Sequence, residues 1–292
     1  HRPAANDGPR MNPLKGFNTG WWRNEDYASV GFQYIEWGKF EPIDDQFDWN
    51  YVEDVIDRKG SQGRHLILQF VVDWNGYEPI ESNYLGPKWL LERVGENHGP
   101  ENPDDPASRI IRATRYDHPD FIEEAGEAIR ALVNRYRDDP RTFVLQVGVL
   151  GFWGEWHTFP RFDWSPSDET KSKILAFYRN SLGPDGLTQI RYPLERIADS
   201  QRGMGYTNGS ATLTDHGKEF GDQIAERKLW KQGPVGGEWP PNVEDSLWQQ
   251  FFQTSAGMEF IKRGHYSTLL PPEPKELTAK LPGWKLEGHF LE

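Results

Sequence analysis

Short apolar segments alternate with amphipathic ones along most of this chain, and that alternation constrains the fold more than any other feature. Residues 65–72 (HLILQFVV) and 144–150 (VLQVGVL) are almost continuously apolar, as expected of parallel strands that are buried on both faces. Residues 49–59 and 119–137 instead repeat apolar side chains at helical spacing. Strands that alternate with helices imply a parallel sheet covered by helices.

Eight segments qualify as strands of that sheet. They are residues 12–22, 30–37, 65–72, 144–150, 187–192, 204–208, 234–237 and 265–269. Eight strands in 292 residues predict an α/β fold, a (β/α)8 TIM barrel that forms a single domain at 12–292 after a flexible N-terminus at 1–11. Only about eight residues separate the first two strands, fewer than a parallel crossover needs, so the first barrel helix is predicted to be short or missing.

Further helices are predicted where apolar spacing and capping residues agree. They cover residues 167–180, 194–202, 218–231, 243–261 and 276–280. The connection at 75–118 is rich in Gly, Pro and Asp and holds a predicted short helix at 87–94. A connection of this length inside a compact domain is usually a functional loop or lid.

The charge balance narrows the range of partners. The chain carries 45 Asp and Glu against 33 Lys and Arg, a formal net charge of −12, and has no basic run. This argues against nucleic acid and anionic membranes, since both favour basic patches. Cys is absent, and no apolar run approaches the ~20 residues of a membrane span. The 13 Trp residues indicate either an aromatic-lined sugar cleft or simply a large core.

Two glutamates occupy matching positions near the ends of predicted strands. Glu155 lies in GFWGEWH and Glu238 in GPVGGEWPP. Because active sites of TIM barrels form at the carboxyl ends of the strands, both are predicted to be catalytic at one mouth. Two carboxyl groups across a glycosidic bond can serve as acid and as nucleophile or base. Apolar rings beside Glu155 are expected to raise its pKa. Either glutamate alone could instead be an ion-pair or helix-capping residue.

Other strand-end residues complete the predicted substrate site. Five tryptophans are predicted sugar platforms, namely Trp37, Trp74, Trp153, Trp156 and Trp239. The remaining predicted substrate-binding residues are Glu36, Asp73, His157, Arg191, Tyr192, Asn208 and Tyr266, and Trp22 ends the first strand. Arg191 could hold Glu155 or Glu238 ionised, bind substrate, or form a structural salt bridge. His157 fits a sugar ligand and a loop histidine equally well.

Metal and cofactor motifs are missing from the sequence. The eight histidines include no pair spaced like the ligands of a zinc helix, and no glycine-rich phosphate loop follows a strand. Residues 151–154 lack the serine of a nucleophile elbow. The sequence therefore predicts a site without metal or cofactor, and it leaves the oligomeric state open.

Two sets of motifs resemble known families. Residues 34–42 (YIEWGKFEP), followed by FDW at 47–49, resemble strands two and three of the clan of barrel glycoside hydrolases that includes the β-galactosidases. More closely, four motifs together resemble the DUF4832 family, bacterial and fungal barrel proteins with proposed glycosidase activity. These are NPLKGF at 12–17, GFWGEWH at 151–157, GYTN at 205–208 and PVGGE at 234–238.

The clan resemblance implies roles for the two glutamates. It makes Glu155 the acid/base residue at the end of strand four and Glu238 the nucleophile at the end of strand seven. The chain departs from the clan pattern at two positions: Gly154 stands where the clan has Asn, and Tyr266 stands where the clan has Trp. We therefore expect a secreted or periplasmic glycoside hydrolase, retaining in mechanism, that acts on a largely neutral saccharide. The alternatives are a polysaccharide lyase on the same scaffold and a non-catalytic carbohydrate-binding barrel.

Overall fold

The predicted TIM barrel is present in the computed structural model, which describes residues 16–20, 28–60, 62–76, 79–192, 202–240, 243–270 and 272. Eight strands close the barrel in the order β1-β2-β3-β6-β7-β8-β9-β10. All neighbours in this order are parallel, and β10 pairs with β1. The strands are β1 (Gly16–Thr19), β2 (Val30–Glu36), β3 (His65–Val71), β6 (Thr142–Gln146), β7 (Thr188–Arg191), β8 (Met204–Asn208), β9 (Val235–Glu238) and β10 (Thr268–Leu270).

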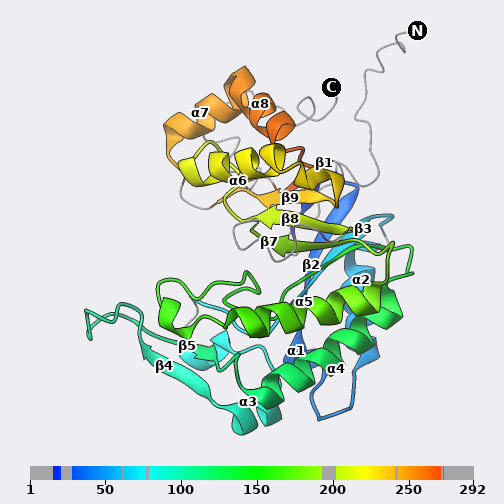
Figure 1. Cartoon of the computed structure of the whole chain (residues 1–292), viewed down its shortest axis with the longest axis vertical. Coiled ribbons are helices and arrows are strands. Elements are labelled where there is room, and N and C mark those ends of the chain that lie inside the picture. Colours follow the sequence, from blue (N-terminus) through cyan, green and yellow to red (C-terminus); the bar gives the residue numbers. More distant parts are fainter. Residues whose placement is uncertain are drawn as a thin grey trace.

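Helices cover the outside of the barrel. Figure 1 shows α6, α7 and α8 on one side and α2, α4 and α5 on the other. Their bounds are α2 (Trp49–Gly60), α4 (Pro119–Tyr136), α5 (Asp168–Leu182), α6 (Asp215–Glu226), α7 (Asp245–Gln253) and α8 (Ser255–Arg263). Shorter elements are α1 (Trp37–Phe40), α3 (Lys88–Val94), η1 (Ile80–Asn83), η2 (Phe162–Trp164) and η3 (Leu229–Lys231).

Capping residues fix where these helices begin. The Ser167 hydroxyl accepts a hydrogen bond from the Thr170 amide at the start of α5. Thr214 accepts one in the same way from the Gly217 amide at the start of α6. Each cap satisfies an amide that has no partner inside its helix, which is why short polar side chains precede the apolar repeats.

The strands face two different environments, as their alternation requires. Outward side chains such as Ile35, Leu68 and Phe70 join the large core between barrel and helices. Inward side chains such as Phe32 and Ile67 form a smaller apolar cluster inside the barrel. That inner cluster covers only the end of the barrel where the strands begin, and polar side chains take over toward the carboxyl ends.

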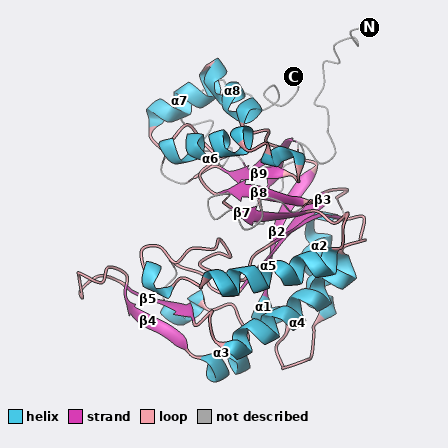
Figure 2. Ribbon diagram, in the orientation of Figure 1, coloured by secondary structure: helices cyan, strands magenta, loops and turns pink. Residues whose placement is uncertain are grey.

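The long connection between β3 and α4 contains structure that the sequence analysis missed. Strands β4 (Glu96–Pro100) and β5 (Ile110–Thr114) pair antiparallel as a separate hairpin, which Figure 2 shows lying apart from the barrel strands. The predicted helix at 87–94 is confirmed as α3. Two predicted strands are shorter than expected, since β6 ends at Gln146 and β10 begins at Thr268.

Several predictions fall outside the described residues. These are the N-terminus at 1–11, the strand end at Trp22, most of the first strand-to-strand connection, and the helices at 194–202 (apart from residue 202) and 276–280. Within the part of the chain that the structure describes, no helix is long and apolar enough to cross a membrane.

Candidate active site

Three glutamines form a polar layer inside the barrel. Gln69 of β3 is level with Gln146 of β6, which is level with Gln189 of β7. The Gln146 Nε2 atom donates to Gln189 Oε1 at 2.9 Å, and Gln189 Nε2 donates to the Pro234 carbonyl at 3.2 Å. Gly236 makes room for this row, because a Cβ there would lie 2.8 Å from Gln189 Nε2.

Sequence reasoning missed this glutamine row, although a signal was present. Each of the segments HLILQFV, TFVLQ and TQIR carries one Gln, and the first two segments are otherwise mostly apolar. A buried amide needs hydrogen-bond partners. Single glutamines in neighbouring buried strands therefore indicate one row of side chains that point into the barrel and bond to one another.

Glu155 and Glu238 both line a narrow pocket above the glutamine row. Glu238 is the last residue of β9, and Glu155 lies on the loop that follows β6. The pocket has a volume of about 40 Å³, room for little more than water molecules. Its other lining residues are Asn18, Phe32, Ile67, Gln69, Gln146, Val147, Gly154, Gln189, Arg191, Thr207, Gly209, Gly236, Gly237, Thr268 and Leu270.

The loop that carries Glu155 has an unusual backbone. Within eight residues, three non-glycine residues have positive φ: Val149 at 70°, Trp153 at 56° and Trp156 at 64°. Gly151 and Gly154 have φ of 74° and 70°. Left-handed conformations are unfavourable for bulky residues and persist only where the surroundings impose them. Such concentrated strain is a common feature of functional loops.

Hydrogen bonds to β3 and its end hold this loop in place. Gln69 Nε2 donates to the carbonyls of Trp153 and Gly154, both at 3.0 Å. The Trp153 amide donates to the Asp73 carbonyl at 2.8 Å. A Cβ on Gly154 would lie 3.0 Å from Gln69 Nε2. Asn also tolerates a left-handed backbone, so it is this close approach that favours Gly where the clan pattern has Asn.

Two cationic or potentially cationic side chains contact the Glu155 carboxylate. Arg191 Nη1 forms an ion pair with Oε1, and His157 Nε2 lies 3.3 Å from Oε2. His157 Nδ1 accepts from the Phe159 amide at 3.2 Å, so in the neutral ring the proton sits on Nε2 and is donated to Glu155. Burial favours a raised pKa for Glu155, but Arg191 and His157 outweigh it and the pKa lies below its ordinary value. The predicted upward shift of the Glu155 pKa was therefore wrong.

Arg191 is positioned by its own neighbours. Gly209 leaves space for it, since a Cβ there would lie 2.6 Å from Arg191 Nη1. The Arg191 guanidinium lies 5.7 Å from the centre of the Tyr192 ring, which in turn lies 4.6 Å from the His216 ring. Burial, together with the charge of Arg191, lowers the pKa of His216. Tyr192 and His216 therefore support Arg191 from outside the pocket and do not line it.

Three of the five predicted sugar platforms are core residues. Trp37 is 0% exposed and donates through Nε1 to Glu41 at 2.7 Å. Trp156 is buried and donates to the Val147 carbonyl at 2.7 Å. Trp239 is buried against Trp248 and two phenylalanines. None of these rings presents a face to a ligand, so their prediction as sugar platforms was wrong.

Trp74 and Trp153 are instead half-buried. Their ring centres are 6.5 Å apart, edge to face. Trp74 also meets Tyr34 edge to face at 5.1 Å, and Tyr34 meets Phe32, which lines the narrow pocket, at 4.8 Å. A continuous aromatic wall therefore leads from Trp153 to the barrel interior.

Four other predicted substrate-binding residues lie elsewhere. Asp73 is fully buried and accepts from the Thr114 amide at 2.9 Å and the Tyr116 hydroxyl at 2.6 Å, so it anchors the β5 region. Asn208 and Tyr266 are buried and do not line the pocket. Glu36 lines a different pocket, where it pairs with a lysine. Placing these residues in the Glu155 pocket was wrong: Tyr266 precedes β10 and so lies at the opposite end of its strand, and Asp73 follows β3 into a buried contact with the β5 region.

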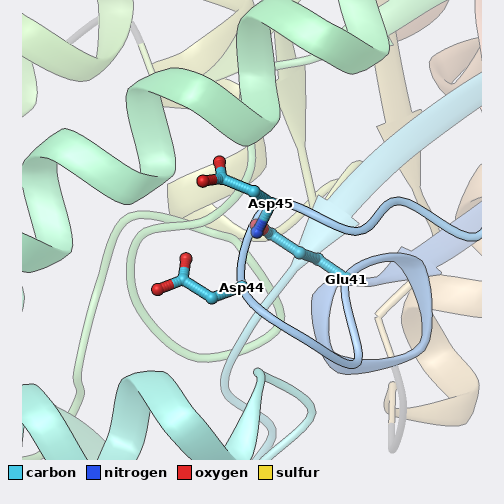
Figure 3. A group of neighbouring side chains, drawn as sticks. All are labelled: Glu41, Asp44 and Asp45. Atoms are coloured by element: carbon cyan, nitrogen blue, oxygen red, sulfur yellow. The ribbon is translucent and has the colours of Figure 1, made fainter.

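An acidic cluster lies on the loop after α1. Figure 3 shows Glu41, Asp44 and Asp45, whose carboxylate oxygens lie within 4.8 Å of one another. Glu41 accepts from Trp37 Nε1 and, at 3.1 Å, from the Asp45 amide, while Asp44 pairs with Arg93 at 2.6 Å. Burial raises the pKa of Glu41 to about 7. These contacts already explain the cluster as a structural brace.

Comparisons with known proteins agree with this architecture. A family model described as beta-galactosidase matches residues 21–148, less than half of the chain. Endo-glycoceramidase II from Rhodococcus sp., solved as a lactosyl-enzyme intermediate, has a TM-score of 0.57 and 16% identity over 90% of this chain and 73% of its own. The likeness establishes the fold. A search of curated proteins returned no match.

Two further solved structures share the fold. Exo-beta-1,4-mannosidase Op5Man5 from Opitutaceae bacterium strain TAV5 has a TM-score of 0.55 and 11% identity over 93% of this chain and 56% of its own. GH5_18 from Bifidobacterium longum subsp. longum has a TM-score of 0.54 and 10% identity over 89% of this chain and 69% of its own. The chain thus resembles glycosidase barrels along nearly its whole length.

Proposed function

We propose that this protein is a glycoside hydrolase with Glu155 and Glu238 as its catalytic pair. The observation that carries the proposal is that both glutamates, from the loop after β6 and from the end of β9, line one pocket inside the barrel mouth. Support comes from the β-galactosidase family model and from glycosidases among the structures that share the fold. Assignment to the DUF4832 family belongs to the same proposal and rests on the four sequence motifs.

The two carboxyl groups divide the work of a retaining reaction. Glu238 attacks the anomeric carbon, and Glu155 protonates the departing oxygen and later deprotonates the water that releases the sugar. Gln69, Gln146 and Gln189 offer amide groups beneath the pair. Trp153 and Trp74 offer apolar ring faces to a sugar that extends outward. Carbohydrate is thus the proposed partner, and activity outside the cytoplasm stays a prediction.

Arg191 sets the pH at which this mechanism operates. A general acid has to be protonated before it reacts, and Arg191 keeps the pKa of Glu155 low. The proposal therefore predicts that kcat/KM is highest at acidic pH and falls as the pH rises through the pKa of Glu155. The pocket is also narrow, so a sugar ring reaches Glu155 only when neighbouring side chains such as Arg191 move.

Matched substitutions test the proposal. Glu155→Gln and Glu238→Gln remove the two charges with little change in shape, and Glu123→Gln alters an exposed glutamate on α4 as a control. On a panel of aryl β-glycosides and oligosaccharides, we expect each catalytic variant to lose about 10²–10⁴-fold in kcat and the control to keep its rate. Activated aryl substrates, which need no proton, should retain more activity in Glu155→Gln. Wild-type rates in both catalytic variants would refute the proposal.

A non-catalytic carbohydrate-binding barrel is the second candidate. The ion pair between Glu155 and Arg191 favours this candidate, because it fits a structural salt bridge. The small volume of the pocket also favours it, because a sugar ring does not enter without a rearrangement. This candidate predicts saccharide binding without turnover at any pH from acidic to neutral. A polysaccharide lyase would instead release unsaturated products that absorb in the ultraviolet from a uronate-containing oligosaccharide, so the same panel with such an oligosaccharide added distinguishes all three.

A further inference from the structure

We propose that a second pocket, beside β2, binds a uronate sugar residue of the substrate, with the sugar ring against Trp74 and its carboxylate toward Arg58. The inference rests on the proposed function and adds a substrate class to it. This pocket has a volume of about 300 Å³, far larger than the one at Glu155 and Glu238, and within the range of small-ligand sites. It is lined by Gln33, Tyr34, Glu36, Lys39, Tyr51, Arg58, Trp74 and Leu85.

The pocket lies along the edge of β2 that faces β1. In the described part of the chain, β1 pairs only with Val30 and Gly31 of β2. Among the described residues, the rest of β2 pairs only with β3. Because side chains alternate along a strand, Gln33 and Tyr34 point to opposite faces of the barrel wall. Both line the pocket, which places the pocket at the edge of the wall itself.

Its charge suits an anion. Glu36 is already paired with Lys39 at 2.8 Å. Arg58, on the exposed face of α2, forms no ion pair with any residue that the structure describes. Among the described residues, the lining therefore carries one net positive charge, in a chain whose formal net charge is −12. A planar guanidinium without a partner is well matched to a carboxylate, which it can bind through two parallel hydrogen bonds.

Its other groups suit a sugar. Tyr34 and Trp74 meet edge to face at 5.1 Å and supply apolar surface. Gln33 is buried, and its Nε2 atom has no hydrogen-bond partner among the described residues. A buried donor of this kind is costly unless something accepts from it, and a sugar hydroxyl or carboxylate oxygen does so.

Trp74 links this pocket to the catalytic one. It contacts Trp153, which directly precedes Gly154 and Glu155 in the lining of the narrow pocket. A saccharide whose uronate lies on Trp74 would therefore follow the aromatic wall toward the glutamate pair. The second pocket would thus bind the part of the saccharide for which the narrow pocket at Glu155 and Glu238 has no room.

Two ligands that differ only at C6 test the inference. Methyl β-D-glucuronide and methyl β-D-glucoside are titrated against the wild-type chain, with tryptophan fluorescence and NMR as readouts. We expect the glucuronide to bind about fivefold more tightly at low salt, and added salt to reduce this preference. Arg58→Gln should abolish the preference, and Arg202→Gln, which alters an exposed arginine in the segment before β8, should leave it intact. Trp74→Ala should weaken binding of both ligands.

The outcomes separate this inference from the proposed function. Equal affinities for the two ligands, no detectable binding, or a preference that survives in Arg58→Gln would overturn the uronate site. Glu155→Gln and Glu238→Gln should both retain the preference, because neither residue lines the second pocket. If the wild type prefers the glucuronide but hydrolyses no glycoside of the panel, only the catalytic proposal is refuted. If it hydrolyses glycosides but shows no preference for the glucuronide, only the uronate site is refuted.

Discussion

Replacing Arg191 by methionine gives the most informative perturbation of the site. The variant keeps much of the side-chain volume and removes the charge that pairs with Glu155. Burial would then dominate, and the pKa of Glu155 should rise above its ordinary value. If Glu155 is the general acid, the alkaline limb of the kcat/KM profile should move to higher pH, even if the maximal rate falls.

The cost in stability follows from the burial of the pair. The Arg191 and Glu155 side chains are 12% and 20% exposed, and removing one partner of such a buried pair costs about 3–5 kcal/mol. Glu155 can escape part of this cost by taking up a proton, and His157 remains beside it. We therefore expect the free energy of unfolding to fall by roughly 2–3 kcal/mol at pH 7.

The pH dependence of this loss has a definite sign. In the wild type the folded-state pKa of Glu155 is lowered, so its stabilisation is present above the unfolded-state pKa and is lost as the pH falls through the folded-state pKa. In Arg191→Met the folded-state pKa is raised, so the variant gains stability as the pH falls. The difference between the two proteins should therefore shrink from neutral toward acidic pH.

Urea unfolding at several pH values, combined with a double-mutant cycle, measures these effects. In a Glu155→Gln background, Arg191→Met should lower the free energy of unfolding only slightly or even raise it, because the substitution then removes an unpaired buried charge. The exposed control Arg202→Met should change the free energy of unfolding by less than about 0.5 kcal/mol. The reasoning would be refuted by an Arg191→Met protein with wild-type stability, or by a stability loss that does not vary with pH.

Two further substitutions test the loop that carries Glu155 and the acidic brace at Glu41. Gly154→Ala should lower the free energy of unfolding by about 1–3 kcal/mol. The loss should exceed that of Gly183→Ala, where φ is a similar 72° but no atom lies within 4 Å of the new Cβ. Equal losses in the two variants would exclude a cost from the contact with Gln69. Glu41 has a pKa raised to about 7, so its contribution is fully present below its unfolded-state pKa and is lost as the pH rises through about 7. Glu41→Gln should flatten the stability profile from about pH 5 to 8, and an unchanged profile would contradict the assignment.

The barrel could be predicted because strands buried on both faces leave apolar runs that helices interrupt at regular intervals. Residues 65–72 and 119–137 are clear examples, and they correspond to β3 and α4. The β4–β5 hairpin could not be predicted in the same way, because its strands lie outside the barrel and Glu96–Pro100 (ENHGP) has no apolar face. Local sequence there resembles an ordinary loop.

The site was only partly predictable for a different reason. A residue at a strand end can turn inward, outward or into the next helix, and the sequence does not specify which. Trp37 begins α1 and packs into the core, whereas Trp74 stays at the surface of a pocket. The sequence suggested that Arg191 could ionise a glutamate, but the choice of Glu155 depends on how the loop after β6 folds back over Gln69.

Covalent trapping tests the central claim most directly. A 2-deoxy-2-fluoro-β-glycoside with a dinitrophenyl leaving group accumulates the glycosyl-enzyme of a retaining hydrolase, and mass spectrometry of the digested protein locates the sugar. We predict one adduct, on the peptide that contains Glu238, and none in Glu238→Gln. An adduct on Glu155, or steady turnover of the parent glycoside with no adduct on either glutamate, would contradict the proposed division of roles.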